Sequence, residues 1–125
     1  MKKYPVRCPI SSFSCIVNGH WKPMIIWNLR NKSLRFKDLI ELLPDISTKV
    51  LSEQLKELEN DRIIIRKKFK EIPPRVEYSL TEYGSTLTPV IATIREWGFK
   101  HLQKNPKILH PKSKWVGKLK KKLTS

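Results

Sequence analysis

Residues 46–60 read ISTKVLSEQLKELEN, the pattern of a capped amphipathic helix. Ser47 is a residue type that caps helix N-termini, and Ile46 and Leu51 on either side of it have the spacing of a hydrophobic staple. The leucines at 51, 55 and 58 repeat at three- and four-residue intervals and share one face. We therefore predict a helix over residues 47–60 whose leucine face is turned to the protein core.

The opposite face of this helix is polar and is the first candidate for contact with a partner. At 100° per residue, it presents side chains that can bond to phosphates or to base edges. Its members are Lys49, Ser52, Glu53 and Lys56, with Thr48 near the N-terminal end. Taken alone, this face is also typical of an ordinary solvated surface, because Glu53 and Lys56 have ion-pair spacing.

Another helix is expected immediately before residue 44. Phe36, Leu39, Ile40 and Leu43 lie at i, i+3, i+4 and i+7, and Pro44 ends the pattern. Two helices separated by a three-residue turn are typical of a helix-turn-helix unit. In such a unit the second helix enters the major groove of DNA.

After residue 62 the pattern changes to alternation, which predicts a two-stranded hairpin with its tip at residues 70–75. We expect Ile63, Ile65 and Phe69 on one face of the first strand and cations on the other. The hairpin has five cations in ten residues against Glu71 alone, which favours phosphate contacts over a solvated face that prevents aggregation. These cations are Arg66, Lys67, Lys68, Lys70 and Arg75, of which Arg75 is expected to probe a groove.

Apolar residues at helical spacing flank this unit on both sides. Residues 9–17 and 21–29 predict two helices before it, and a long apolar helix begins or bends at Pro89. The order predicts an α+β, mainly α fold, a winged helix-turn-helix with a two-stranded wing and further helices at the N- and C-terminal ends.

The chain has 26 Lys and Arg against 11 Asp and Glu in 125 residues, a formal net charge of +15. Such an excess attracts nucleic acid first and anionic membranes second. Eight lysines and no acid follow residue 103. We therefore expect a DNA-binding and dimerisation domain over 1–103 and a basic tail over 104–125. The tail could contact flanking DNA, dock on an anionic membrane or stay solvated.

Several classes of function lack sequence support. No stretch has transmembrane length, and prolines interrupt a signal-like start, so we expect a cytoplasmic protein without membrane insertion. The histidines show no metal-ligand spacing, and no nucleophile elbow, phosphate loop or HExxH pair is present. The sequence predicts no catalytic residue, no metal and no cofactor.

The sequence contains, in this order, the segments CP (8–9), GHWK (19–22), RF (35–36) with Leu39, ISTKVL (46–51), QLKELE (54–59), PPRVEYSLTEYG (73–84) and WG (97–98). Through these segments, from about residue 8 to residue 98, the chain resembles the HxlR-type regulators. That resemblance implies a dimeric winged-helix transcription factor in which the first and the long C-terminal helix form the dimer interface. The residues then expected at the interface of these N- and C-terminal dimerisation helices are Phe13, Val17, Leu87, Val90, Ile91, Ile94 and Trp97.

The expected function is a sequence-specific regulator, with an operator in duplex DNA and a second copy of the chain as its partners. Repression would follow from occlusion of polymerase, and activation is equally compatible with the sequence. The alternative is a nonspecific, nucleoid-type protein that binds nucleic acid through charge alone. The sequence identifies neither the operator nor the effector.

Cys8 is a candidate sensor of oxidants or electrophiles, because several regulators of the resembled family sense them through a cysteine at this position. The start of a helix and the nearby Arg7 are both expected to favour its thiolate. A cysteine that only packs against the neighbouring subunit is the alternative. Cys15 lies about 10 Å along the same helix, too far for a disulfide with Cys8 within one intact helix, whereas a bridge between two subunits stays open.

Overall fold

The structure is a computed structural model that describes residues 6–124, and the side chains of residues 6–119. The chain forms two compact units, Met1–Thr88 and Pro89–Ser125. The first contains α1 (Pro9–Ile16), α2 (Lys22–Asn28), α3 (Phe36–Leu42), α4 (Thr48–Asn60), β1 (Ile64–Phe69), β2 (Arg75–Leu80) and α5 (Glu82–Ser85). The second contains nearly all of α6 (Thr88–Lys104), the short 3-10 helix η1 (Pro106–Ile108) and α7 (Trp115–Thr124).

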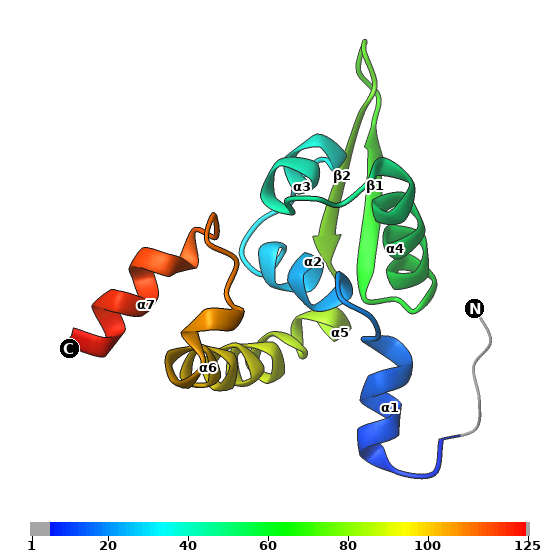
Figure 1. Cartoon of the computed structure of the whole chain (residues 1–125). Helices are drawn as coiled ribbons and strands as arrows, with labels where there is room; N and C mark the ends of the chain where they lie inside the picture. The colour runs from blue at the N-terminus through cyan, green and yellow to red at the C-terminus, as the bar shows by residue number, and fades with distance from the viewer. Residues whose placement is uncertain (1–5, 125) are drawn as a thin grey trace. The chain divides into compact units, whose positions relative to one another are not determined.

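The first unit is a winged helix-turn-helix, as the sequence predicts. Helices α2, α3 and α4 lie beside a two-stranded antiparallel sheet, and the hairpin extends well beyond the helices (Figure 1). The leucines of α4 at positions 51, 55 and 58 are all buried. They lie in a core with Ile25, Ile26, Leu29, Leu39, Leu43, Ile63 and Ile64.

Both ends of α4 are fixed by the local sequence. At the start, the Ser47 hydroxyl accepts a hydrogen bond from the Val50 amide at 3.1 Å, which confirms the predicted cap. At the end, the Ile63 amide donates to the Leu58 carbonyl and the Arg62 amide to the Glu59 carbonyl, both at 3.0 Å. This is a Schellman ending, and Arg62 takes the left-handed conformation that it requires, with φ 62°.

The first strand begins one residue later than the sequence predicted. Ile63 belongs to the turn that ends α4, and the strand begins at Ile64. Alternation therefore places Ile64, Arg66 and Lys68 on one face. Ile65, which was expected with the apolar set, is 52% exposed.

The wing strands pair from Ile64 opposite Leu80 to Phe69 opposite Arg75. Leu34, between α2 and α3, adds a short antiparallel bridge to Tyr78. Its amide donates to the Tyr78 carbonyl at 2.9 Å, and the Tyr78 amide donates to the Leu34 carbonyl at 2.8 Å. The base of the wing is thus joined to the helix-turn-helix through the backbone.

Gly84 in α5 lies against the backbone at the start of the wing. A Cβ atom at this position would be 1.9 Å from the Ile63 carbonyl oxygen. The Thr81 hydroxyl holds the two segments together, because it donates to the Arg62 carbonyl at 2.6 Å and accepts from the Gly84 amide at 2.8 Å. Only glycine fits this approach.

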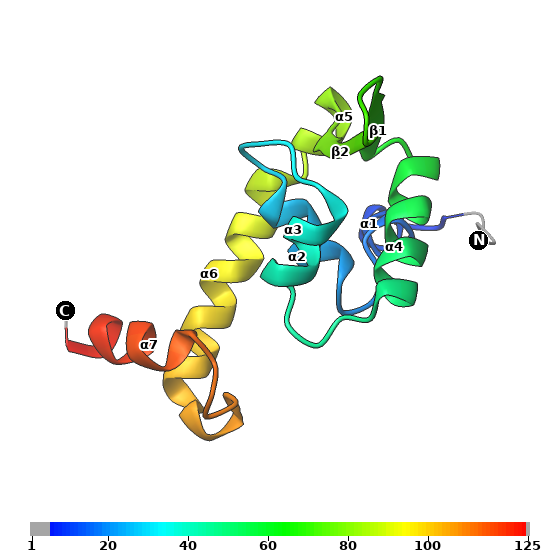
Figure 2. The ribbon, with the colours of Figure 1, turned by 90° about the horizontal axis from the view of Figure 1, so that it is seen from above.

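In the second unit, α6 leads through the turn that contains η1 into α7 (Figure 2). The unit begins at Pro89, whereas the sequence suggested a boundary after residue 103. The reason for the difference is that Phe99 of α6 contacts Trp115 of α7 edge-to-face, with ring centroids 5.0 Å apart. In the described part of the chain, no helix has both the length and the apolar character to span a membrane.

Candidate nucleic-acid interface

The polar face of α4 is accessible in the structure. Thr48, Lys49, Glu53 and Lys56 are exposed and Ser52 is half-buried, in contrast to the leucines on the opposite side of the helix. Lys49 and Lys56 are two turns apart and lie on the same face. The five candidate readers named from the sequence therefore occupy one side of a fixed helix.

A shallow depression of about 340 Å³ connects this face of α4 to the wing. Lys56 of α4 and Arg66 of β1 both line it, and Lys68 follows Arg66 on the same face of the strand. The basic face of the wing is thus continuous with the polar face of α4. The residues that line the depression are Ser52, Leu55, Lys56, Glu59, Arg66 and Tyr78.

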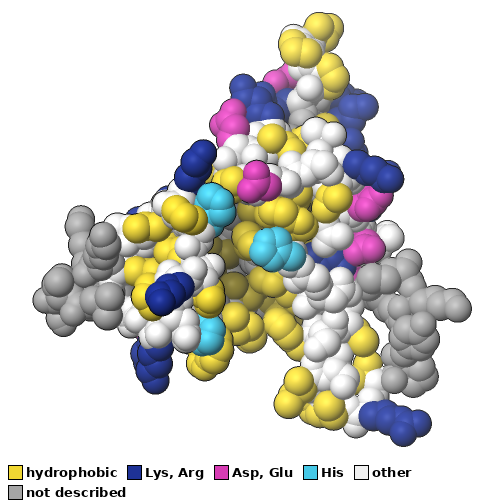
Figure 3. All heavy atoms as spheres, in the orientation of Figure 1, with side chains coloured by type: hydrophobic (Ala, Val, Ile, Leu, Met, Phe, Trp, Pro, Cys, Tyr) yellow, Lys and Arg dark blue, Asp and Glu magenta, His cyan; other side chains and the backbone are white. Residues whose placement is uncertain are grey.

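The wing presents cations on both of its faces (Figure 3). Arg66 and Lys68 lie on the face with Ile64, whereas Lys67 lies on the other face, opposite Glu77. Arg66, Lys67, Lys68 and Lys70 are all exposed. Ile72, Pro73 and Pro74 are also exposed and make the tip apolar.

Arg75 differs from the other cations of the wing. Its guanidinium forms ion pairs with Glu77 at 3.1 Å and Glu71 at 3.3 Å. It also lies 4.0 Å from the ring centroid of Phe69, its partner across the sheet. The sequence predicted that Arg75 would probe a groove, but the structure engages it in contacts within the wing.

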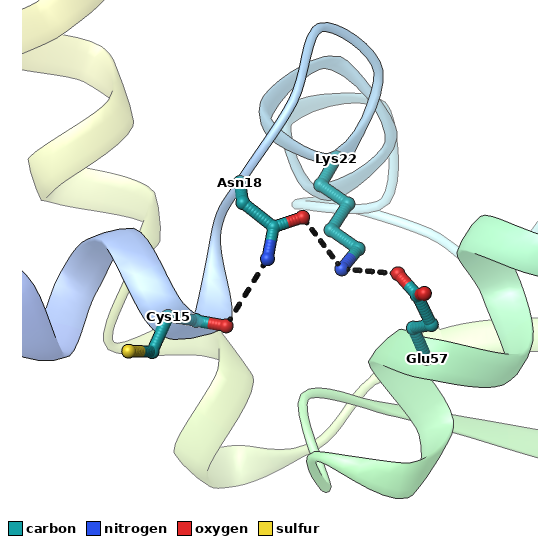
Figure 4. A network of polar contacts seen from close by, with 4 residues as sticks. All are labelled: Cys15, Asn18, Lys22 and Glu57. Atoms are coloured by element: carbon teal, nitrogen blue, oxygen red, sulfur yellow. Dashed lines mark hydrogen bonds and ion pairs between the residues drawn. The ribbon is translucent and has the colours of Figure 1, made fainter. Parts of the chain in front are cut away.

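A buried lysine connects α2 to α4. Lys22 is 0% exposed, and its Nζ lies 2.5 Å from Glu57 of α4 and 3.1 Å from the Asn18 side-chain oxygen (Figure 4). The Asn18 amide in turn donates to the Cys15 carbonyl at the end of α1. This network connects α4 to α2 and to the end of α1. The burial of Lys22 was not predicted from the sequence, because a lysine in an apolar helix is normally expected to reach solvent.

Cys8 is the N-cap residue of α1 and is exposed. Its sulfur accepts a hydrogen bond from the Ser11 amide at 3.5 Å and lies 3.2 Å from the Ser11 hydroxyl. The bonds from the Ser11 hydroxyl and amide lower the pKa of the Cys8 thiol from its ordinary value of 9.0. From the sequence, the helix dipole and Arg7 were expected to lower the pKa of Cys8, but hydrogen bonding to Ser11 is the main cause.

The residues expected at the dimer interface fall into two groups. Val17 and Ile91 are buried within the single chain, and Phe13 and Leu87 are half-buried. Val90, Ile94 and Trp97 are 44%, 48% and 66% exposed and form an apolar stripe along α6. Trp97 also stacks on His101, with ring centroids 5.0 Å apart.

Metal chemistry has no support among the described residues, which contain no group of three His, Cys, Asp or Glu side chains suited to an ion. Tyr78 was not among the predicted site residues, yet it lines the depression beside Arg66. Its position follows from the strand register, which pairs Arg66 with Tyr78.

Comparison with known proteins agrees with this geometry. The family described as HxlR-like helix-turn-helix matches residues 16–106. The HTH-type transcriptional regulator YdeP of Bacillus subtilis is 41% identical over 101 residues, which cover 81% of this chain and 79% of YdeP.

Two solved structures of regulators are also similar. The redox regulator HypR in its reduced form superposes with a TM-score of 0.74 at 32% identity, covering 82% of this chain and all of HypR. The diamide-treated transcriptional regulator YodB of Bacillus subtilis gives a TM-score of 0.64 at 38% identity, covering 77% of this chain and 96% of YodB.

Proposed function

The chain belongs to the HxlR-like helix-turn-helix family of transcriptional regulators, and from this premise we propose that it binds a specific DNA operator as a homodimer. The polar face of α4 reads base edges in the major groove. Lys49 and Lys56 contact guanine or phosphate. Thr48 and Ser52 bond to several bases, and Glu53 accepts from cytosine N4. The wing cations contact phosphates.

The observation on which this proposal rests is the continuity of the basic surface from α4 to the wing. Lys56 and Arg66 line one depression, and Lys68 extends the same strand face toward the tip. A helix seated in a major groove places the wing over the adjacent backbone, where cations release counterions from phosphates. Lys67 and Lys70, also exposed, are available for the same contact.

The apolar stripe of α6 supports the dimer. Val90, Ile94 and Trp97 are large, exposed and on one side of the helix. A second copy of the chain would cover them, and two symmetric copies would place their α4 helices in successive major grooves about 34 Å apart. The operator would then be a near-palindrome. Occlusion of polymerase at such a site would give repression.

Selection from duplexes with a random central segment would identify the operator, and fluorescence anisotropy would then compare it with a scrambled duplex. We expect Lys56→Ala to reduce the preference for the operator. Replacement of Lys67, Lys68 and Lys70 by Gln should weaken binding to both duplexes and lower the salt dependence. A wild-type protein that shows no preference for any selected sequence would refute specific recognition.

The alternative function, a nonspecific nucleoid-type protein, predicts a different result in a salt titration. A specific regulator keeps a preference of roughly a thousandfold or more for its operator. A protein that binds through charge alone binds both duplexes almost equally at every salt concentration.

We also propose that Cys8 makes the regulator responsive to oxidants or electrophiles, as the redox regulator HypR suggests by similarity. The Cys8 thiolate would add to a diazene such as diamide. A second thiol would then attack the sulfur of this adduct and displace the hydrazine. The two thiols form a disulfide and give up two protons and two electrons, which reduce the diazene to a hydrazine.

This proposal is tested with matched cysteine variants. Diamide should change the operator affinity of the wild-type protein and of Cys15→Ser, but not that of Cys8→Ser. Cys15 is the appropriate control, because it lies on the same helix and no sulfur contact is shown for it. An identical response of Cys8→Ser and the wild type would exclude Cys8 as the sensor.

A further inference from the structure

A group of cations surrounds one tryptophan in the second unit. The ring centroid of Trp115 lies 4.5 Å from the Lys118 Nζ, 4.9 Å from the Arg95 Cζ and 5.4 Å from the Lys114 Nζ. Arg95 comes from α6, whereas Lys118 belongs to α7 and Lys114 directly precedes it. We refer to Arg95, Lys114, Trp115 and Lys118 as the Trp115 cluster.

The cluster is held in place by apolar contacts. Phe99 of α6, which is 8% exposed, packs against Trp115 edge-to-face, and Leu119 of α7 is 4% exposed. The apolar residues at the start of α7 therefore face their own unit. Lys114 and Lys118 are both exposed, so the segment presents its positive charge from an anchored position.

The charge of this unit is strongly unbalanced. Residues 89–125 contain ten Lys and Arg and a single acid, Glu96. Like charges this close repel one another, and a polyanion relieves that repulsion. A run of phosphates along a nucleic-acid backbone fits an anchored row of cations, because each contact also releases condensed counterions.

We propose that the Trp115 cluster and the exposed lysines of residues 104–118 form a second phosphate-binding surface, which binds the backbone of double-stranded DNA without reading its sequence. The choice of DNA as the partner rests on the proposed function. Residues 107–125 lie outside the family match, so Lys114, Trp115 and Lys118 are additions to the family's DNA-binding unit.

DNA is favoured over a membrane by the burial of the apolar residues. An interfacial helix enters a bilayer through an exposed apolar face. Among the described side chains of α7, Leu119 is buried, and Trp115 and Val116 are half-buried. The accessible residues in this part of the helix are Gly117 and Lys118.

The test uses the full-length protein with Lys112, Lys114 and Lys118 replaced together by Gln, and the same three replaced by Arg as the matched control. Anisotropy measures binding to the selected operator and to a scrambled duplex across a range of salt concentrations. The slope of log K against log salt should fall by about 0.9 for each phosphate that is no longer neutralised, about 2.7 for three. The Arg variant should keep the wild-type slope.

The expected result is that the Gln variant loses affinity by the same factor, tenfold or more, for both duplexes and keeps the wild-type preference. An unchanged slope in a Gln variant with wild-type circular dichroism would overturn the proposal. Lysine-dependent binding to phosphatidylglycerol vesicles, with DNA binding unchanged, would also overturn it and assign the surface to membranes. Failure of specific recognition appears separately, as an absent operator preference in the wild-type protein.

Discussion

At the scale of single residues, the ion pair between Lys22 and Glu57 is asymmetric. The lysine is fully buried, whereas the Glu57 side chain is 32% exposed. Removal of the carboxylate leaves a buried ammonium whose one remaining partner among the described side chains is Asn18, while removal of the ammonium leaves a carboxylate that water can reach.

We therefore expect Glu57→Ala to cost about 3 kcal/mol of the free energy of unfolding, and Lys22→Met to cost about 1 kcal/mol or less. Methionine fills most of the lysine volume without a charge. Urea denaturation followed by circular dichroism measures both values. Equal losses for the two variants, or a larger loss for Lys22→Met, would show that the buried charge is not what makes this pair necessary.

The Ser11 hydroxyl governs the reactivity of Cys8. Its bond to the sulfur is the largest cause of the lowered pKa, and it stabilises the thiolate. Because the shift is downward, more thiolate is present at neutral pH than an ordinary cysteine would provide. In a Cys15→Ser background, alkylation of Cys8 by iodoacetamide should therefore reach half its maximal rate below pH 9.0.

We expect Ser11→Ala to raise the pKa of Cys8 and to move the alkylation profile toward higher pH. Ser12→Ala is the matched control, since no hydroxyl contact with the sulfur is shown for Ser12, and it should leave the profile unchanged. If the pH profile of alkylation did not change in Ser11→Ala, the lowered pKa of Cys8 would have another cause.

At the scale of secondary-structure elements, α5 and the start of the wing are in close contact at Gly84. A methyl group there would overlap the Ile63 carbonyl, and neither backbone has room to move without breaking the Thr81 bonds. We expect Gly84→Ala to destabilise the first unit by about 3 kcal/mol or more. Its urea midpoint should fall well below that of the wild type.

Gly117→Ala serves as the comparison for this prediction. A Cβ atom at Gly117 in α7 would meet nothing within 4 Å. Alanine favours helix over glycine by up to about 1 kcal/mol, so this variant should be neutral or slightly stabilising. If both glycine variants behaved alike, the contact with Ile63 would not be the cause.

The sequence predicted the helices well, because their signals are local. Ser47 caps α4 and its leucines are buried, as their spacing indicates. The start of the first strand was placed one residue early, because Arg62 and Ile63 complete the ending of α4, with Arg62 in a left-handed conformation that an arginine rarely adopts. The buried side chain at the start of β1 is therefore Ile64, whereas Ile65 is exposed.

The candidate site was predictable in composition but not in its contacts. The exposed lysines of α4 and β1 follow from the amphipathic pattern. The ion pairs of Arg75 and the bond from Asn18 to Lys22 depend on neighbours that only the folded chain brings together. Pattern analysis assigns a face to a residue, whereas the partner of a charge depends on tertiary structure.

At the scale of the whole molecule, the apolar stripe of α6 determines the predicted state of assembly. Val90, Ile94 and Trp97 expose apolar area that a second copy would bury. We expect Ile94→Glu to convert a dimer to a monomer in sedimentation velocity, because it places a charge in the middle of the stripe. Operator affinity should fall at the same time.

Thr93→Glu is the control for Ile94→Glu. Thr93 is exposed and adjacent in α6 but outside the stripe, so this variant adds the same charge and should remain a dimer. A monomeric wild-type protein at micromolar concentration, or dissociation by Thr93→Glu alone, would contradict the assignment of the interface.

The contacts of Arg75 affect how the wing meets DNA. With its guanidinium between Glu71 and Glu77 and over Phe69, the hairpin has its shape before any ligand arrives. The entropy cost of ordering those residues is then part of folding and does not oppose association. Such a preorganised wing is already ordered when it meets DNA and does not fold on contact. The rate of association is then not limited by an ordering step in the wing.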